Sequence, residues 1–281
     1  MSRGPTLFNR VSVALGLVFL YAPIVLLVVY SFNDGRLATV WAGASLRWYR
    51  ALLNDAQMLD AVWVSLRVGV LAASLATVLG ALAAVALTRG GRFRGRLGFS
   101  AMVYAPLVMP EVILGLSLLL LFVALDLPRG FWTVVLSHAT VTLCYAAVVI
   151  GARLSSFDWT LEDAARDLGR RPLGAFLAVT LPNIAPAVGA AWMLAFALSL
   201  DDLVIASFAS GPGATTLPMR LYSQVRLGVN PEINAVSSLI IGGVGAAVAA
   251  AWLLQSRRTA PTRPSLRLRA PGPSCARSPR S

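Results

Sequence analysis

The sequence contains no lysine, because all 24 of its basic residues are arginine. A P-loop requires a lysine to reach the nucleotide phosphates, and Schiff-base or pyridoxal catalysis requires an amine nucleophile. The chain therefore cannot supply these chemistries by itself. A single histidine and two cysteines, Cys144 in an apolar run and Cys275 in a polar one, argue against a disulfide framework and a zinc or haem site. We expect no catalytic residue, metal or cofactor in this chain.

Charged residues are also scarce, at 13% of the 281 residues, whereas 57% are hydrophobic. This composition argues against an ordinary soluble domain and indicates a chain solvated mainly by lipid. A helix needs about 20 apolar residues to cross a bilayer. The sequence offers six such segments, at roughly 11–31, 61–87, 99–123, 132–151, 183–207 and 234–254. We therefore predict an all-α, polytopic membrane protein with six transmembrane helices.

The arginines are unevenly distributed between the two sides of such a bundle. With a cytoplasmic N-terminus, seventeen of them fall in cytoplasmic segments and six on the opposite side. The net charge of +12 is therefore interpreted as a positive-inside bias rather than a nucleic-acid footprint, and both termini are expected in the cytoplasm. Residues 255–281 are rich in Arg, Pro and Ser and are expected to form a disordered tail. The tail is interpreted as a positive-inside anchor, with anionic lipid binding as the alternative.

The connection from Ala152 to Pro182 has a helical pattern of its own. Thr160 and Asp163 have the spacing of a capping box, which predicts a helix start, and Gly169 is a natural C-terminal cap. A second short helix is expected to begin at Pro172. The pair Leu181 and Pro182 is expected to break the chain before the fifth span. One face of the first short helix is apolar, formed by Leu161, Ala164, Ala165 and Leu168.

The same loop contains a longer motif. It reads Glu162-Asp163-Ala164-Ala165, then Gly169, then Val179-Thr180-Leu181-Pro182. This run resembles the E-A-A-x3-G-x9-I-x-L-P loop of binding-protein-dependent ABC importer permeases. Asp163 stands where the family usually has Glu and Val179 where Ile is common, and both keep the charge or the shape. The resemblance implies docking onto a cytoplasmic ATPase through coupling residues Glu162, Asp163, Ala164, Ala165, Gly169, Leu181 and Pro182. From the pattern alone, an interfacial helix pair on the membrane is an equal alternative.

Further stretches are similar to the polyamine subfamily of these permeases, closest to the putrescine type. They are residues 105–111, 199–204, 207–213 and 227–234. The resemblance covers roughly residues 11–254 and implies the type I ABC importer permease fold. It divides the chain into three parts. Residues 1–60 contain the first transmembrane helix and a periplasmic loop. Residues 61–254 form a five-helix core with its coupling loop at 152–182, and residues 255–281 form the tail.

The resemblance also implies a location and partners. The location is the bacterial inner membrane, among membrane lipid and without nucleic acid. The partners are a second, non-identical permease subunit, a cytoplasmic ABC ATPase dimer that binds ATP and magnesium, and a periplasmic polyamine-binding protein. The expected function is that of a permease subunit for ATP-driven import of a polyamine, putrescine or spermidine. One alternative keeps the fold but carries another small cation, an organic acid or ferric iron. An alternative of another class is a stand-alone cation channel or secondary antiporter.

Three acids lie within predicted spans: Glu111 midway along the third, and Asp201 and Asp202 in the outer part of the fifth. A carboxylate at the bilayer centre costs about 3 kcal/mol and usually faces the bundle interior. Ser199 lies on the helical face of Asp202. We therefore predict a cation pathway lined by Glu111, Ser199, Asp201 and Asp202, and the channel alternative would use Glu111 and Asp202 as its ion sites.

Adjacent residues diverge by about 100° on a helix, so Asp201 and Asp202 cannot both point into one pore. Asp202 is preferred for the pathway, and Asp201 is expected to cap a broken helix or to meet Arg67. The alternative for both acids is a structural cap or an ion pair at the gate. Pro106 and Pro110 are expected to kink the third helix. The only histidine, at position 138, is interpreted as a packed or interfacial residue.

Overall fold

The computed structural model describes residues 6–35, 40–91, 93–227 and 231–258. The chain consists of two compact units, Met1–Val236 and Ser237–Ser281. The regular structure in the described ranges is helical, apart from one bridge between Asn33 and Ala44, and this confirms the all-α prediction. The tail from residue 259 onward, with Cys275, lies outside the described residues.

The first part contains the following elements. They are α1 (Leu7–Tyr30), α2 (Arg47–Asn54), α3 (Ala56–Arg89), α4 (Arg96–Val108), α5 (Glu111–Ala124), α6 (Phe131–Ser155), α7 (Thr160–Asp167), α8 (Pro172–Ala175), the π-helical turn η1 (Phe176–Thr180), α9 (Leu181–Asp201), α10 (Val204–Ala209) and α11 (Leu217–Leu227). The last helix, α12 (Glu232–Arg258), begins in the first part and continues into the second.

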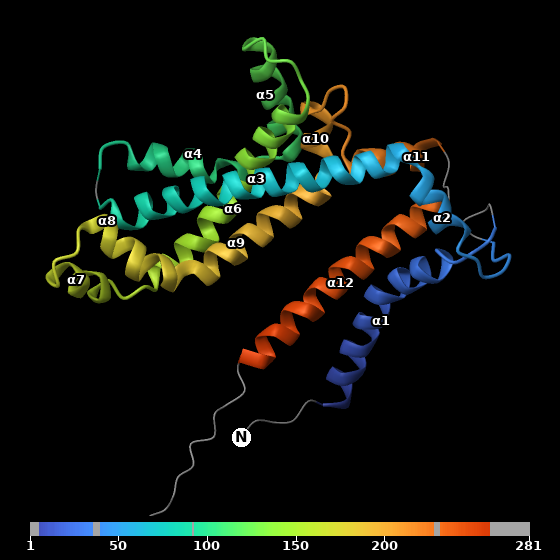
Figure 1. The fold of residues 1–281 in the computed structure, drawn as a ribbon, viewed down its shortest axis with the longest axis horizontal. Coiled ribbons are helices and arrows are strands. Elements are labelled where there is room, and N and C mark those ends of the chain that lie inside the picture. The colour runs from blue at the N-terminus through green and yellow to red at the C-terminus, as the bar shows by residue number, and fades with distance from the viewer. Residues whose placement is uncertain (1–5, 36–39, 92, 228–230, 259–281) are drawn as a thin grey trace, which may run out of the picture. The chain divides into compact units, whose positions relative to one another are not determined.

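Helices α3, α6 and α9 pack together as the centre of the first part (Figure 1). The carboxylate of Asp55 starts α3 by accepting the backbone N–H groups of Gln57 and Met58. Further along, a Cβ atom at Gly80 would lie 2.8 Å from the Cβ of Ala146 on α6. Small residues therefore allow the two backbones to approach closely, as is typical of helix pairs in membranes.

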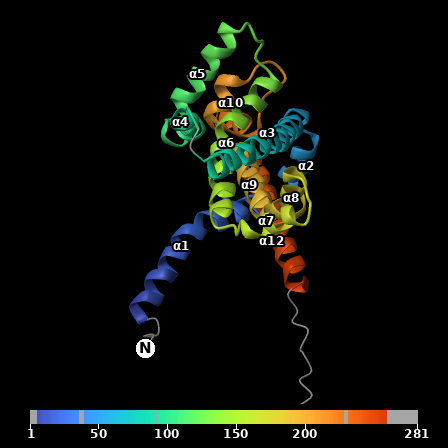
Figure 2. The ribbon, with the colours of Figure 1, turned by 90° about the vertical axis from the view of Figure 1, so that its left-hand side faces the viewer.

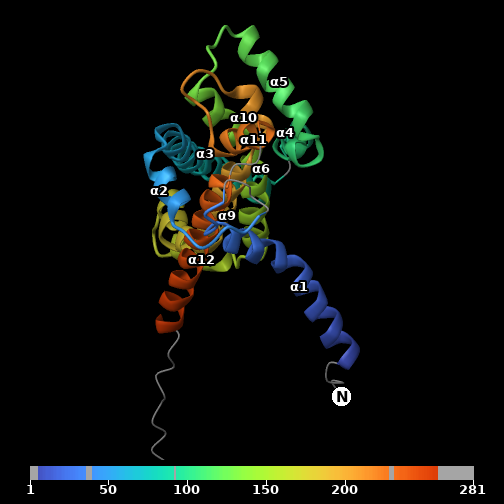
Figure 3. The same ribbon diagram turned by 90° about the vertical axis from the view of Figure 1, so that its right-hand side faces the viewer.

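Shorter helices surround this centre. Helices α5 and α10 lie side by side in two perpendicular views (Figures 1 and 2), and both contact α6. Helix α2 lies beside the first turns of α3 (Figure 3), where Leu52, Met58 and Val236 form a small buried cluster.

Within the described ranges, four helices are long and apolar enough to cross a membrane: α1, α3, α6 and the continuous helix Pro172–Asp201. A fifth span is present if α4 and α5 count as one, although they bend by 119°. The expected kink is thus a full break. Met109 adopts an extended conformation (ψ 138°) because the ring of Pro110 disfavours helical geometry in the residue before it.

The predicted break at Leu181 and Pro182 is wrong, because the helix runs without interruption from Pro172 to Asp201. The turn η1 explains the continuity. The N–H of Leu181 donates to the carbonyl of Phe176, five residues back, so the wider turn precedes a proline that has no N–H to donate.

Candidate functional site

The predicted coupling loop contains the short helix α7, but its cap differs from the prediction. The side chain of the N-cap residue, Trp159, makes no capping hydrogen bond. Asp158 instead accepts hydrogen bonds from the N–H and the hydroxyl of Thr160, at 3.1 and 2.8 Å. The expected capping box of Thr160 and Asp163 is therefore wrong, because the Thr160 hydroxyl donates to Asp158, two residues before it.

The end of α7 follows the prediction. Gly169 has a φ of +89°, a left-handed conformation that costs glycine little. Its N–H donates to the carbonyl of Arg166, and the N–H of Arg170 donates to that of Ala165. This pair of bonds is a Schellman motif, and it turns the chain sharply toward α8.

Glu162 lies on the inner side of α7 and is 1% exposed. Its Oε1 accepts a hydrogen bond of 2.6 Å from Arg89 Nη2, at the end of α3. Its Oε2 accepts from the hydroxyl of Thr180, at the end of η1. The guanidinium also lies over the ring of Trp159, 4.9 Å from its centroid. Glu162 thus joins α7 to α3 and to the start of α9.

The opposite face of α7 is bare. Leu161 is 50% exposed, Leu168 is 87% exposed, and Ala164 and Asp163 are exposed beside them. Large apolar side chains on this face have little cover from the described part of the chain. Such a surface is typical of a helix that docks onto another protein.

The four residues predicted to line a cation pathway lie together in the structure. They surround one cavity of about 260 Å³ between the start of α5, the middle of α6 and the junction of α9 with α10. Among the described residues, its lining contains three carboxylates and no arginine. The complete lining is Glu111, His138, Val141, Thr142, Tyr145, Leu198, Ser199, Asp201, Asp202, Leu203 and Val204.

The two adjacent acids have different roles from those expected. Oδ1 of Asp202 accepts the N–H groups of Ile205 and Ala206, at 2.9 and 3.1 Å, so Asp202 and not Asp201 caps the broken helix. Asp201 lines the same cavity but is exposed. Arg67 lies over the rings of Trp63 and Phe131. Both acids line one cavity, which the 100° divergence of neighbours was expected to exclude, and the adjacent pair Leu198 and Ser199 within α9 lines it as well.

His138 is the main addition to the predicted set. Its Nδ1 lies 2.7 Å from the hydroxyl of Ser199. Its Nε2 has no hydrogen-bond partner among the residues that the structure describes and lies 4.0 Å from Oδ1 of Asp202. The interpretation of His138 as packed is correct, since it is 1% exposed, but it is packed against the cavity.

Sequence reasoning missed other residues for a common reason. Arg89 lies 73 positions from Glu162, and Thr142 and Tyr145 lie on a different helix from the acids. No local spacing connects residues so far apart. The sequence offered one signal for the contact between Arg89 and Glu162: an arginine at the end of an apolar span and an acid in a cytoplasmic loop.

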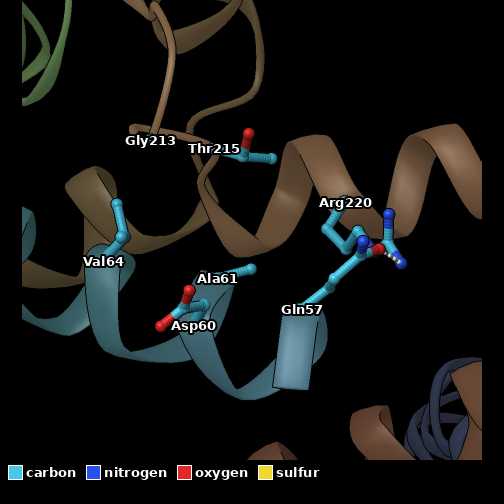
Figure 4. Close-up of a pocket in the computed structure, with 7 residues that line it drawn as sticks. All are labelled: Gln57, Asp60, Ala61, Val64, Gly213, Thr215 and Arg220. Atoms are coloured by element: carbon cyan, nitrogen blue, oxygen red, sulfur yellow. Dashed lines mark hydrogen bonds between the residues drawn. The ribbon is translucent and has the colours of Figure 1, made fainter. Parts of the chain in front are cut away.

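A second polar cavity, of about 300 Å³, lies between α3 and α11 (Figure 4). Gln57 and Arg220 approach one another from the two helices, and Arg220 Nη2 donates to Gln57 Oε1 at 2.6 Å. Asp60 lies one turn further along α3 on the same cavity. This cavity was not predicted.

Residues 76–258 match a protein family described as "Binding-protein-dependent transport system inner membrane component". The chain is 57% identical over 249 residues to the putrescine transport system permease protein PotI of Escherichia coli K12, which covers 86% of this chain and 89% of the relative. It is 40% identical over 223 residues to the spermidine/putrescine transport system permease protein PotC of the same organism, covering 79% and 84%.

A solved structure is similar in fold. The crystal structure of a bacterial ABC transporter involved in the import of the acidic polysaccharide alginate superimposes with a TM-score of 0.66 at 17% identity, over 91% of this chain and 98% of that chain.

The chain belongs to the family of binding-protein-dependent transport system inner membrane components. It is a multi-pass permease subunit of an ABC importer in the inner membrane, and a partner ATPase hydrolyses the ATP. The family implies two kinds of partner, the ATPase and a periplasmic binding protein.

Proposed function

We propose that this chain forms the translocation path of a polyamine importer and that putrescine is its principal cargo. The observation that carries the proposal is the cavity in which Glu111, Asp201 and Asp202 meet. A dication that leaves water loses hydration, and fixed carboxylates in a bundle interior replace it by charge attraction. The relatives named for putrescine and for spermidine transport support the same cargo class.

The proposed topology has six spans with both termini in the cytoplasm. The distribution of arginines supports this orientation, which places the loop 152–182 on the cytoplasmic side. The proposed organisation is a first helix and periplasmic loop at 1–60, a five-helix core at 61–254 and a tail at 255–281. The core pairs with a second, non-identical permease subunit and receives cargo from a periplasmic polyamine-binding protein.

The loop 152–182 is proposed to couple this path to the ATPase dimer. The exposed face of α7, with Asp163 and Ala164, supplies the docking surface, Ala165 lies beside it, and Gly169 sets the turn after it. ATP binding closes the ATPase dimer and moves the docked loop, and hydrolysis resets it. Glu162 transmits this movement to α3 and α9 because it is bonded to Arg89 and Thr180. Leu181 and Pro182 fix the connection to α9.

Uptake of labelled putrescine tests the cargo. Cells that lack redundant polyamine transporters are compared with and without this chain, with ATP depleted, and with excess unlabelled spermidine as competitor. We expect saturable uptake that requires both the chain and ATP. Unchanged uptake after deletion would remove the polyamine proposal and leave the family membership intact.

A further inference from the structure

We infer that His138 is a substrate-contacting residue, and that its Nε2 atom and the Asp202 carboxylate together hold one ammonium group of the cargo. The inference rests on the proposed function, because it requires a protonated amine to enter the cavity. It concerns a residue outside the set of carboxylates and Ser199 that the sequence predicts.

A contact with Ser199 orients the His138 ring. His138 lies on α6 and Ser199 on α9, and the contact of 2.7 Å between Nδ1 and the Ser199 hydroxyl fixes the ring plane. We assign the tautomer in which Nδ1 donates its proton to that hydroxyl, so that the neutral imidazole presents a lone pair at Nε2. In this tautomer Nε2 is a hydrogen-bond acceptor at the wall of the cavity.

The surroundings of Nε2 favour a cation. The ring is 1% exposed, and Nε2 has no hydrogen-bond partner within the described ranges. A buried polar atom without a partner is costly, and one that persists calls for an explanation such as a bound ion or ligand. The cavity next to it contains three carboxylates, so a cation is the ligand that this wall attracts.

Oδ1 of Asp202 lies 4.0 Å from Nε2, which is too far for a direct hydrogen bond. An ammonium nitrogen about 2.9 Å from Nε2 can donate one N–H to it while it lies in charge contact with the Asp202 carboxylate. The cap bonds from Ile205 and Ala206 hold this carboxylate in place and use the two lone pairs of Oδ1, so its other oxygen, Oδ2, is the acceptor for a second N–H.

The remaining lining assigns the rest of the cargo. Val141, Leu198 and Val204 offer apolar surface for a methylene chain, and Glu111 and Asp201 are carboxylates available to a second ammonium group. The cavity thus combines an acceptor pair, of a buried His138 and a partly buried Asp202, with two more exposed acids. This asymmetry fits a short aliphatic diamine that enters one end first.

Two substitutions separate this role from a purely structural one. His138→Gln can place an acceptor near the former Nε2 position, whereas His138→Asn can place one only near the former Nδ1 position, facing Ser199. If Nε2 contacts the cargo, the glutamine variant retains more transport. If the histidine serves only to bond Ser199, the asparagine variant retains more.

The experiment measures putrescine uptake over a range of concentrations in cells that produce the complete importer. We expect His138→Asn to raise KM about tenfold, equivalent to about 1.4 kcal/mol, and His138→Gln to raise it less. ATPase activity stimulated by the binding protein, together with the amount of assembled complex, controls for folding. A KM for the asparagine variant equal to or below that of the glutamine variant would overturn the inference alone. Absence of putrescine uptake by the wild-type importer would overturn the proposed function and the inference with it.

Discussion

The Arg89 guanidinium and the Glu162 carboxylate form a bond of 2.6 Å between the end of α3 and the short helix α7. The carboxylate is buried and the guanidinium is partly exposed. The first glutamate of the coupling motif therefore faces its own chain, and the residues after it face outward. In the proposed coupling, the ATPase would push on the exposed face of α7, and the bond between Arg89 and Glu162 would carry this movement to α3.

Replacement of Arg89 by alanine tests this transmission. The change leaves the buried Glu162 carboxylate without its cation. Removal of one partner leaves an uncompensated buried charge, which destabilises the packing of α7 against α3. We expect transport to fall several-fold while binding-protein-stimulated ATP hydrolysis falls less, so that less cargo moves per ATP. Arg94→Ala, at an exposed arginine of the next loop, is the matched control. Equal transport per ATP in both variants would contradict the role of the pair.

Gly169 provides a second test of the coupling loop. Its left-handed backbone closes α7, and a Cβ atom there would be strained whatever the space around it. We expect Gly169→Asp to lower uptake and to uncouple ATP hydrolysis from transport, with the chain still inserted in the membrane. Gly169→Asn is the control for charge, since asparagine tolerates this conformation comparatively well. Normal uptake by the aspartate variant would remove the coupling role.

Asp202 has an observed role as a helix cap and a proposed role in the cation pathway, and substitution can separate the two. Asparagine is as good an N-cap as aspartate, whereas alanine costs about 1 kcal/mol at such a position. We expect Asp202→Asn to preserve the thermal stability of the complex and to lower putrescine uptake, because the charge is lost. Asp202→Ala is expected to lower both. If the asparagine variant transports normally, Asp202 is only a cap, and the cation pathway must depend on Glu111 and Asp201.

The close contact of α3 with α6 predicts a stability effect far from the cavity. A methyl group at Gly80 meets Ala146, and overpacking of this kind costs about 1–3 kcal/mol. We expect Gly80→Ala to lower the Tm of the complex and Ala146→Gly to restore part of it. Gly151→Ala serves as the control, since its nearest neighbour, the Cβ of Ala84, would lie 3.9 Å away. Equal Tm values for the two glycine variants would contradict the packing.

The sequence predicts where the apolar helices lie, because a run of about 20 apolar residues has few alternatives in a bilayer. Of the six predicted spans, four correspond to unbroken helices long enough to cross a membrane within the described ranges. The sequence also predicts the Gly169 turn, since the left-handed position favours glycine. The sequence does not predict that the helix breaks completely at Met109 and Pro110. It also does not predict that the helix continues through Pro182. The helix passes Pro182 after a π-helical turn, whereas it breaks before Pro110.

The acids of the cavity could be predicted, because a charge within an apolar span needs a reason. Their partners could not. His138 meets Ser199 across 61 positions of sequence, and Asp202 takes the cap expected of Asp201 because α9 ends at Asp201, inside the predicted span 183–207. Contacts of this kind depend on how helices pack, and helical periodicity holds no information about a neighbouring helix.

A polyamine path driven by a partner ATPase should carry putrescine only as part of the complete importer. Accumulation of labelled putrescine in proteoliposomes distinguishes this from a stand-alone channel, with the complete importer and its binding protein in one preparation and this chain alone in another. We expect accumulation against a gradient by the complete importer with ATP, and no flux through the chain alone. Flux of putrescine through the chain alone, without ATPase or binding protein, would contradict it.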